Sequence, residues 1–203
     1  LEAVYVTAAR SELVPVGEAG ERLATELARV RTALLGGGSG SGGSSVDDGD
    51  VEIAICSRSL ADDLWVVRTV SDTAAATYHL FTPHQKAAPR LLLLARPALS
   101  GLPLAVTQCV QLRARDGVCL HAYLTRPRHA TEGTAADDMA SGPPPPGLDA
   151  AVGGGCDLRL PLAILLHGGP NARDYAGYDP TTQLLAARGI AVLKINYRGS
   201  TGE

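Results

Sequence analysis

Hydrophobic and polar residues alternate in short segments over the first hundred residues, a pattern that predicts β-strands. Residues 1–16 carry this alternation on both sides of a polar break at residues 9–12, so we expect a hairpin there. Four further apolar segments, each bounded by polar or turn-forming residues, predict an antiparallel meander like a blade of a β-propeller. These segments are residues 51–56, 64–70, 77–81 and 91–95.

One segment follows a helical period instead. Its large apolar residues are spaced by three or four positions, and Gly36 comes directly after the last turn. The spacing predicts a helix over residues 21–35 that packs one apolar face against a core. The apolar positions are Leu23, Leu27, Val30 and Leu34.

Two polar stretches, Asp62-Asp63 and Ser71-Asp72, separate the predicted strands. Aspartate and serine are typical turn residues because their side chains hydrogen-bond to the local backbone. We therefore interpret both stretches as solvated turns and not as paired catalytic acids.

The pattern changes after residue 104. Segments 106–113 and 118–124 flank an Asp116-Gly117 turn, which predicts a second hairpin. Residues 160–166 then form a nearly continuous apolar run, typical of a strand that is covered on both faces.

A helix and another strand follow this run. Asp179 precedes Pro180, and Gly189 lies just past the apolar segment, which predicts a helix with Asp179 as its N-cap. Residues 190–195 are again apolar. The succession of strand, helix and strand predicts a βαβ unit with a parallel sheet.

We therefore predict a mixed fold of two parts. Residues 1–104 form an antiparallel β region with a blade-like meander, and residues 105–203 form the N-terminal part of an α/β domain. A low-complexity stretch interrupts each part: the Gly/Ser-rich residues 36–50 and the Pro/Gly-rich residues 131–157. Such compositions do not build a packed core, so we expect exposed insertions.

The composition narrows the classes of function. A net charge of -3 and a pI near 6.0 give no basic surface for nucleic acid, and no apolar run approaches the roughly 18 residues of a membrane span. The histidines and the four cysteines lack metal-ligand spacing, so we expect no metal. We expect the cysteines to be small buried thiols, and the lack of a disulfide pattern favours a cytoplasmic location.

A glycine pair follows the apolar run at residues 160–166 and is the strongest candidate for chemistry. Backbone N–H groups held at such a turn can stabilise the oxyanion that forms during acyl transfer, and glycine admits a substrate without a Cβ clash. The pair is Gly168-Gly169. A Gly-Gly turn after a strand is also a common structural feature, so these residues alone leave both interpretations open.

Longer motifs around the pair resemble the prolyl oligopeptidase family of serine peptidases, in its acylaminoacyl-peptidase and dipeptidyl-peptidase branch. The resemblance covers residues 51–203 and includes the hairpin around Gly117. Its strongest motifs are His167-Gly-Gly-Pro-Asn-Ala-Arg-Asp-Tyr-Ala-Gly-Tyr-Asp-Pro180, Gln183-Leu-Leu-Ala-Ala-Arg-Gly189 and Asn196-Tyr-Arg-Gly-Ser-Thr-Gly202.

The resemblance implies a β-propeller that caps an α/β-hydrolase domain, in which a Ser-Asp-His triad cleaves peptides without a cofactor. It implies that Gly169 supplies one oxyanion-hole N–H, that Gly168 shapes the turn, and that His167 packs or hydrogen-bonds beneath the loop. Arg198 is the candidate substrate-binding residue, with pinning of the strand end as the alternative. We expect a peptide as partner and neither nucleic acid nor a membrane; homo-oligomer formation stays open.

The chain departs from the family pattern because it holds no Gly-x-Ser-x-Gly nucleophile elbow. We expect the nucleophile and the other triad residues to lie beyond Glu203, so that this chain alone is an inactive fragment. Two alternatives stay open. One is a carboxylesterase or lipase, which shares the strand that ends in His-Gly-Gly. The other is an inactive truncated product that acts as a binding module.

Overall fold

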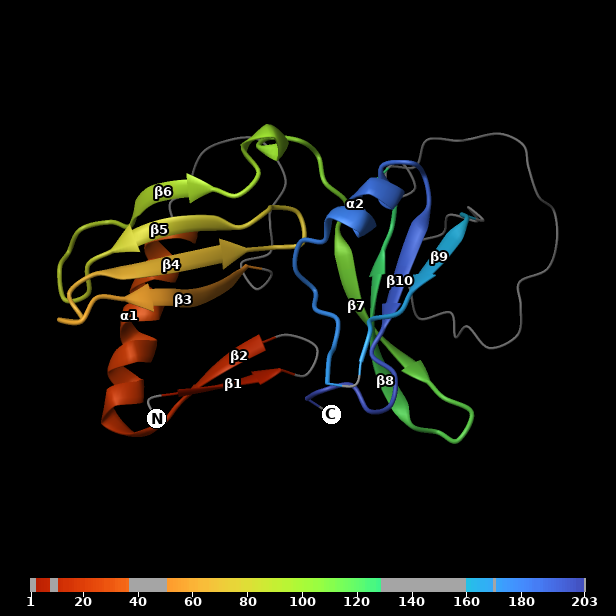
Figure 1. Ribbon diagram of the computed structural model, residues 1–203, viewed down its shortest axis with the longest axis horizontal. Helices are drawn as coiled ribbons and strands as arrows, with labels where there is room; N and C mark the ends of the chain where they lie inside the picture. Colours follow the sequence, from red (N-terminus) through yellow and green to blue (C-terminus); the bar gives the residue numbers. More distant parts are fainter. Residues whose placement is uncertain (1–2, 8–10, 37–50, 129–159, 170, 203) are drawn as a thin grey trace.

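The computed structural model describes residues 3–7, 11–36, 51–128, 160–169 and 171–202. Two four-stranded sheets lie side by side, and each carries one α-helix (Figure 1). A two-stranded hairpin lies below the first sheet in the same view. The predicted insertions at residues 36–50 and 131–157 lie almost wholly outside the described residues.

The N-terminal hairpin and the helix that follows it form as the sequence pattern predicts. Strands β1 (Ala3–Thr7) and β2 (Ser11–Pro15) pair antiparallel. Helix α1 spans Gly17–Leu35 and therefore begins four residues earlier than its apolar spacing predicts. Gly17 has a φ of 64°, a conformation that glycine adopts at low cost and that lets the chain turn from strand into helix.

The predicted meander is confirmed by the strand pairing of the first sheet. Each strand pairs antiparallel with the next one in the chain, so that the order is β3-β4-β5-β6. The pairing of β3 with β4 shifts between Ile55 and Ser57, which is a β-bulge. The four strands are β3 (Glu52–Arg58), β4 (Trp65–Val70), β5 (Thr77–Phe81) and β6 (Arg90–Leu94).

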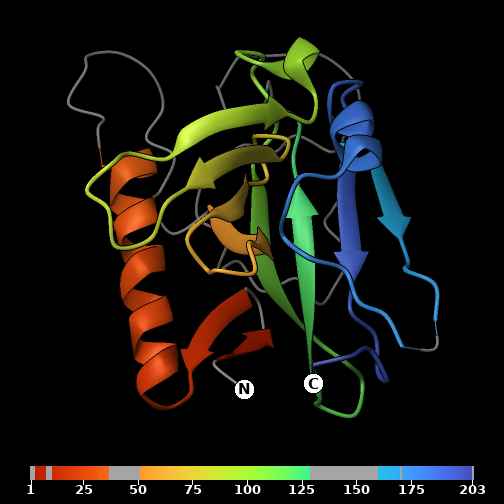
Figure 2. The same ribbon diagram turned by 60° about the vertical axis from the view of Figure 1, so that its left-hand side comes forward.

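Helix α1 packs against one face of this meander, and its side chains are part of the main core (Figure 2). Its predicted apolar face is confirmed: Leu27 and Val30 are buried, and Leu23 and Leu34 pack around them. From the sheet, Ile53, Trp65, Val67 and Phe81 complete the cluster. Trp65 and Phe81 are opposite each other on β4 and β5, and their tilted rings lie 5.8 Å apart, a favourable aromatic pairing.

The second sheet is mixed, with the order β7-β8-β10-β9. Strands β7 (Thr107–Arg113) and β8 (Cys119–Thr125) form the predicted hairpin, in which Gly117 takes a φ of 88°. Strand β10 (Ala191–Ile195) pairs antiparallel with β8 but parallel with β9 (Leu162–Leu165). The predicted parallel sheet is therefore limited, among the described strands, to the pair of β9 and β10.

The prediction that residues 160–166 form a strand covered on both faces is wrong for this structure. Strand β9 lies at the edge of the sheet, with β10 as its one neighbour among the described strands. Leu162, Ile164 and Leu166 alternate along the chain and are 54%, 56% and 64% exposed, so this face is not covered by the described residues. A continuous apolar run shows that a strand is suited to burial, but the run by itself does not place the covering elements.

Helix α2 (Pro180–Ala186) connects β9 and β10 as the predicted crossover. The Asp179 side chain accepts a hydrogen bond of 2.6 Å from the backbone N–H of Thr182, which confirms the predicted N-cap. Gly189 follows the helix with a φ of 80° and turns the chain into β10. A short 3₁₀ helix, η2 (Pro97–Leu99), lies in the segment between β6 and β7.

The two sheets are joined by a buried set of hydrogen bonds around Gln183, which is 7% exposed. Its Oε1 accepts from the Ala105 N–H at 2.8 Å, and its Nε2 donates to the carbonyl oxygens of Ala105 and Asp72 at 2.8 and 3.0 Å. The Asp72 carboxylate in turn accepts from the Thr107 N–H at 2.6 Å. These residues, which we call the Gln183 junction, connect the first sheet, the segment that leads into β7, and α2.

The junction corrects the interpretation of Ser71-Asp72 as a solvated turn. Ser71 and Asp72 are 4% and 6% exposed, because α2 and the start of β7 cover the loop between β4 and β5. Asp62 and Asp63 do form a turn near the surface, where Asp62 pairs with Arg58. The prediction of a domain boundary at residues 104/105 concerns this same junction and stays a prediction.

The described cysteines, Cys56, Cys109 and Cys119, form no disulfide. Cys56 and Cys119 are exposed and Cys109 is partly buried, so the expectation of buried thiols is wrong for the first two. Cys56 lies at the β-bulge of β3 and Cys119 at the start of β8, both at the periphery of their sheets. No helix in the described part of the chain combines the length and apolar character needed to cross a membrane.

Candidate functional site

The candidate site is formed by two segments that leave the carboxyl ends of neighbouring parallel strands. One follows β9 and contains Gly168 and Gly169; the other follows β10 and begins at Asn196. In α/β sheets, ligands bind at this end of the strands, because the loops there leave the sheet and surround a shared crevice.

Backbone and side-chain hydrogen bonds connect the two segments. The Thr201 N–H donates to the Ala172 carbonyl at 3.0 Å, and the Arg173 guanidinium donates to the Thr201 carbonyl at 2.9 Å. Asn196, which is fully buried, accepts from the Asp174 N–H at 2.8 Å and donates to the Asp174 carbonyl at 3.2 Å. The segment after β10 therefore holds the segment after β9 in place.

His167 packs and hydrogen-bonds beneath the glycine pair, which confirms the expectation for this residue. Its ring stacks on Tyr197 with 4.4 Å between the centroids and 14° between the planes. Nδ1 lies 2.8 Å from the Gly168 carbonyl oxygen, and Nε2 lies 2.8 Å from the Ser200 Oγ. The Tyr197 hydroxyl donates to the His167 carbonyl at 2.9 Å, so that the same tyrosine fixes both the ring and the backbone.

Gly168 and Gly169 are exposed at the start of the loop after β9. A Cβ at Gly168 would meet no atom within 4 Å, and a Cβ at Gly169 would meet only the Tyr197 Oη, at 3.7 Å. Within the described part of the chain, the Gly169 N–H donates no hydrogen bond. An exposed backbone donor on a loop fixed from below is chemically suited to bind an oxyanion.

Two charged residues, Lys194 and Asp174, lie near the glycine pair, and they differ in their hydrogen bonds. Lys194, on β10, donates to the Tyr175 carbonyl at 3.0 Å. Asp174 has one carboxylate oxygen, Oδ2, that is buried without a hydrogen-bond partner. Burial raises the pKa of Asp174 above its usual value near 3.8, although the charges of Lys194 and His167 act in the opposite direction.

We expect the substitution Asp174→Asn to raise stability at neutral pH. Because the folded state binds the Asp174 proton more tightly than the unfolded chain does, the ionised carboxylate costs stability above its folded pKa. This cost disappears as the pH falls below 3.8, where both states are protonated. Thermal unfolding from pH 7 to pH 3 should therefore show a melting-temperature gain for the variant that shrinks with acidity. A gain of equal size at all pH values would contradict a titration effect.

The structure places Arg198 at the surface, where its guanidinium pairs with Asp116 in the turn between β7 and β8. This ion pair corresponds to the alternative that Arg198 pins the strand end. Both side chains are more than half exposed, so the pair adds little to stability. Contact of Arg198 with a substrate stays a prediction.

Sequence reasoning did not assign the roles of Tyr197, Ser200 and Asn196. They belong to the Asn-Tyr-Arg-Gly-Ser motif, which signalled the segment but not the contacts of its members. It also did not assign the role of Gln183, which was recognised only as the first residue of a motif that resembles the family.

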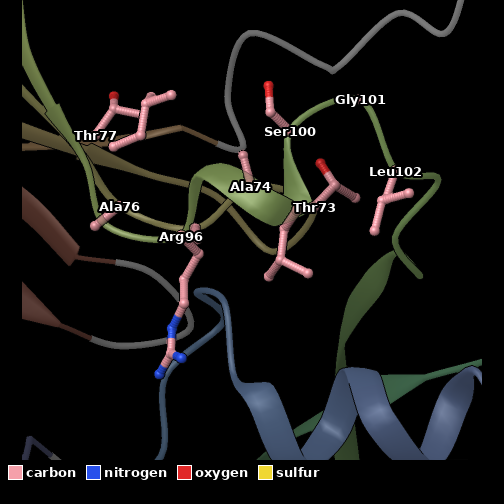
Figure 3. Close-up of a pocket in the computed structure, with 11 residues that line it drawn as sticks. Thr73, Ala74, Ala76, Thr77, Arg96, Ser100, Gly101 and Leu102 are labelled. Atoms are coloured by element: carbon pink, nitrogen blue, oxygen red, sulfur yellow. The ribbon is translucent and has the colours of Figure 1, made fainter.

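A separate cavity of about 160 Å³ lies between the loop that follows β4 and the segment around η2. Figure 3 shows the hydroxyl groups of Thr73 and Ser100 beside it, with the Arg96 guanidinium extending away from them. Its other lining residues include Ala74, Ala76 and Leu102. The cavity lining provides no pair of nucleophile and base, so the segments after β9 and β10 remain the candidate site.

Comparison with known proteins identifies relatives of the chain among dipeptidyl peptidases. The chain is 36% identical over 154 residues to dipeptidyl aminopeptidase BIII of Pseudoxanthomonas mexicana, a match that covers 76% of this chain and 20% of that protein. It is 33% identical to dipeptidyl peptidase family member 6 of Caenorhabditis elegans, over 73% of this chain and 19% of that protein. The chain thus spans about a fifth of the length of these curated relatives.

Among solved structures, the puromycin-hydrolyzing peptidase of Mycobacterium tuberculosis aligns with a TM-score of 0.49 and 23% identity, over 69% of this chain and 18% of that one. No model of a protein family matches the chain. The resemblance predicted from the motifs is confirmed by the two sequence matches: over about three quarters of its length, this chain is a relative of the dipeptidyl peptidases of the prolyl oligopeptidase family.

Proposed function

We propose that this chain belongs to a serine peptidase that hydrolyses short peptides through an acyl-enzyme. The sequence identity of 36% to a dipeptidyl aminopeptidase carries the proposal, since the match includes most of this chain. The exposed Gly169 N–H, on a loop held by the segment after β10, supports it chemically. The substrate is a peptide, and the reaction needs no metal or organic cofactor.

In this proposal residues 1–104 belong to a β-propeller, and residues 105–203 begin an α/β-hydrolase domain. The antiparallel meander β3–β6 supports the first assignment, and the parallel pair β9–β10 with its helical crossover supports the second. The free, exposed thiols of Cys56 and Cys119 support a reducing compartment, which we propose to be the cytoplasm.

The reaction begins when a serine hydroxyl attacks the carbonyl carbon of the peptide bond. A histidine takes the hydroxyl proton, and the carbonyl oxygen becomes an oxyanion. The Gly169 N–H donates to this oxyanion, so that its negative charge is stabilised by a donor already in position. The carbon–nitrogen bond then breaks, the amine leaves with the proton, and water hydrolyses the acyl-enzyme ester.

We do not assign His167 and Ser200 as the histidine and serine of the triad. His167 is held on both ring nitrogens, and Ser200 is 6% exposed, so this pair does not present a nucleophile to a substrate. We propose that the nucleophile comes from the remainder of the natural protein, and that residues 1–203 alone do not hydrolyse peptides.

A fluorophosphonate probe, which reacts with activated serines, tests the proposal on the natural protein. A cell extract is labelled, and the species that yields the tryptic peptide of residues 174–188 is isolated and weighed. We expect a labelled species much heavier than 21.0 kDa that cleaves dipeptidyl amides. Labelling with hydrolysis of p-nitrophenyl esters alone would identify an esterase, and an unlabelled species near 21.0 kDa would identify a binding module.

A further inference from the structure

The imidazole ring of His167 has a polar partner at each of its nitrogens. Nδ1 lies 2.8 Å from the Gly168 carbonyl oxygen, and Nε2 lies 2.8 Å from the Ser200 Oγ. The Ser200 Oγ also lies 2.6 Å from the carbonyl oxygen of Tyr197. These three contacts form one chain of polar atoms that begins and ends at a backbone carbonyl.

The two carbonyl ends determine how many protons this chain of atoms holds. A carbonyl oxygen can only accept a hydrogen bond, so each of the three contacts needs a proton of its own. The Ser200 hydroxyl has one proton, which it donates to the Tyr197 carbonyl, and its oxygen then accepts from Nε2. Nδ1 donates to the Gly168 carbonyl. The ring therefore carries a proton on both nitrogens and has a positive charge.

A neutral ring would leave one of the three contacts without a proton. If the Ser200 hydroxyl turned to a bare Nε2, its oxygen would face the Tyr197 carbonyl at 2.6 Å as a second acceptor. If Nδ1 were bare, it would face the Gly168 oxygen in the same way. The charged ring is thus favoured over either neutral form by about one charge-assisted hydrogen bond.

The groups around the ring also favour its charge. The His167 ring stacks on the Tyr197 ring, whose face attracts a cation. Burial raises the pKa of Asp174 while the charges of Lys194 and His167 lower it, so a charged His167 and the Asp174 carboxylate attract each other. The nearby cations, Lys194 and Arg173, each donate to a backbone carbonyl oxygen of another residue.

The charge of the ring has a consequence for the Gly169 N–H. The Gly168 carbonyl and the Gly169 N–H belong to one planar peptide unit. A charged donor at the carbonyl oxygen draws electron density through this unit, and hydrogen bonds that share a group strengthen one another. The Gly169 N–H is therefore a stronger donor than that of a peptide whose carbonyl is free.

We propose that His167 is an imidazolium cation that polarises the peptide between Gly168 and Gly169 and thereby strengthens the Gly169 N–H as a donor to an oxyanion. His167 acts through this peptide and not on the substrate, so it is a positioning residue. The inference rests on the proposed function only where it treats Gly169 as the oxyanion donor. The charge of the ring itself does not require any catalytic activity.

Nitrogen-15 NMR of the 203-residue chain, labelled at histidine and glycine, tests the charge of the ring. His167→Gln identifies the His167 signals by their loss. At pH 7 we expect the wild-type ring to carry protons on both nitrogens. In Ser200→Ala the Nε2–H loses its acceptor, so the ratio of charged to neutral ring should be about tenfold smaller at any pH between 6 and 9.

Two variants serve as controls for Ser200→Ala. Ser200→Thr keeps a hydroxyl, so the ratio of charged to neutral ring should stay close to that of the wild type. Tyr197→Phe removes a hydrogen bond to the His167 backbone but keeps the carbonyl that accepts from Ser200, so it should also leave the ratio unchanged.

The backbone amide of Gly169 reports the polarisation in the same samples. Gly169→Ala identifies its signal by loss. The nitrogen-15 shift of this amide should change with pH in step with the charge of His167, and it should stay constant over the same pH range in His167→Gln.

A mostly neutral wild-type ring at pH 7, or equal ratios in the wild type and Ser200→Ala, would overturn the charged ring. A Gly169 amide that does not follow the charge of the ring would overturn the polarisation. None of these measurements depends on peptidase activity, so failure of this inference can be told apart from failure of the proposed function.

Discussion

Replacement of Gly169 by proline in the natural full-length protein is expected to lower kcat by about 10²–10³-fold, because it removes one oxyanion donor. Proline has no N–H, and every other group of the proposed site stays in the chain. The effect should appear mainly in kcat, since the oxyanion exists only in the transition state and the intermediate. Steady-state hydrolysis of a dipeptidyl amide measures it.

Gly169→Ala is the control for this substitution, because it adds a side chain but keeps the N–H. Gly169 does not have a positive φ, and the added Cβ would meet the Tyr197 Oη at 3.7 Å, an ordinary contact distance. Alanine should therefore retain most of the activity. If alanine and proline lowered kcat equally, the space at Gly169 would matter and its N–H would not.

Replacement of Gln183 by leucine is expected to destabilise the folded chain by about 3 kcal/mol, the cost of leaving buried backbone groups without partners. The leucine would leave the N–H and the carbonyl of Ala105, and the carbonyl of Asp72, without the bonds that Gln183 provides. For a chain of this size the melting temperature should fall by about 6–12 °C. Thermal unfolding by circular dichroism measures the change.

Leu184→Gln, the opposite substitution at the next residue of the helix, is the control. Leu184 lies on the same helix but is 54% exposed, so Leu184→Gln should change the melting temperature by less than about 2 °C. Limited proteolysis gives a second measurement, because loss of the Gln183 junction should expose the segment before β7 to cleavage. An unchanged melting temperature in Gln183→Leu would mean that the two sheets do not depend on this junction.

Sequence patterns within single segments predicted the helices and strands of the fold well. The spacing of Leu23, Leu27, Val30 and Leu34 predicted both the existence of α1 and its buried face, although the helix begins at Gly17, before the apolar period starts. The cap at Asp179 depends on residues within one turn of the chain, and it was correct in detail. The alternating pattern of the first hundred residues identified every strand of the meander.

The errors concern residues whose surroundings come from distant parts of the chain. Asp72 has the local chemistry of a solvated turn, yet it is buried by contacts with Thr107 and Gln183, the latter 111 positions away. Strand β9 has the composition of a central strand, yet its position in the sheet is set by β10. Burial depends on which elements meet, and a local pattern contains no information about that.

The sequence by itself determined which segments are helices and strands, where glycines turn the chain, and that Gly168-Gly169 follows a strand in a motif that resembles the prolyl oligopeptidase family. These properties follow from hydrophobic period, turn chemistry and motif order, which are all local in the chain. Only the tertiary structure decided that Ser200 reaches His167, that Arg198 pairs with Asp116, and that Gln183 joins the two sheets. Each of these contacts depends on distance and direction between elements, which packing sets and the linear order of residues does not.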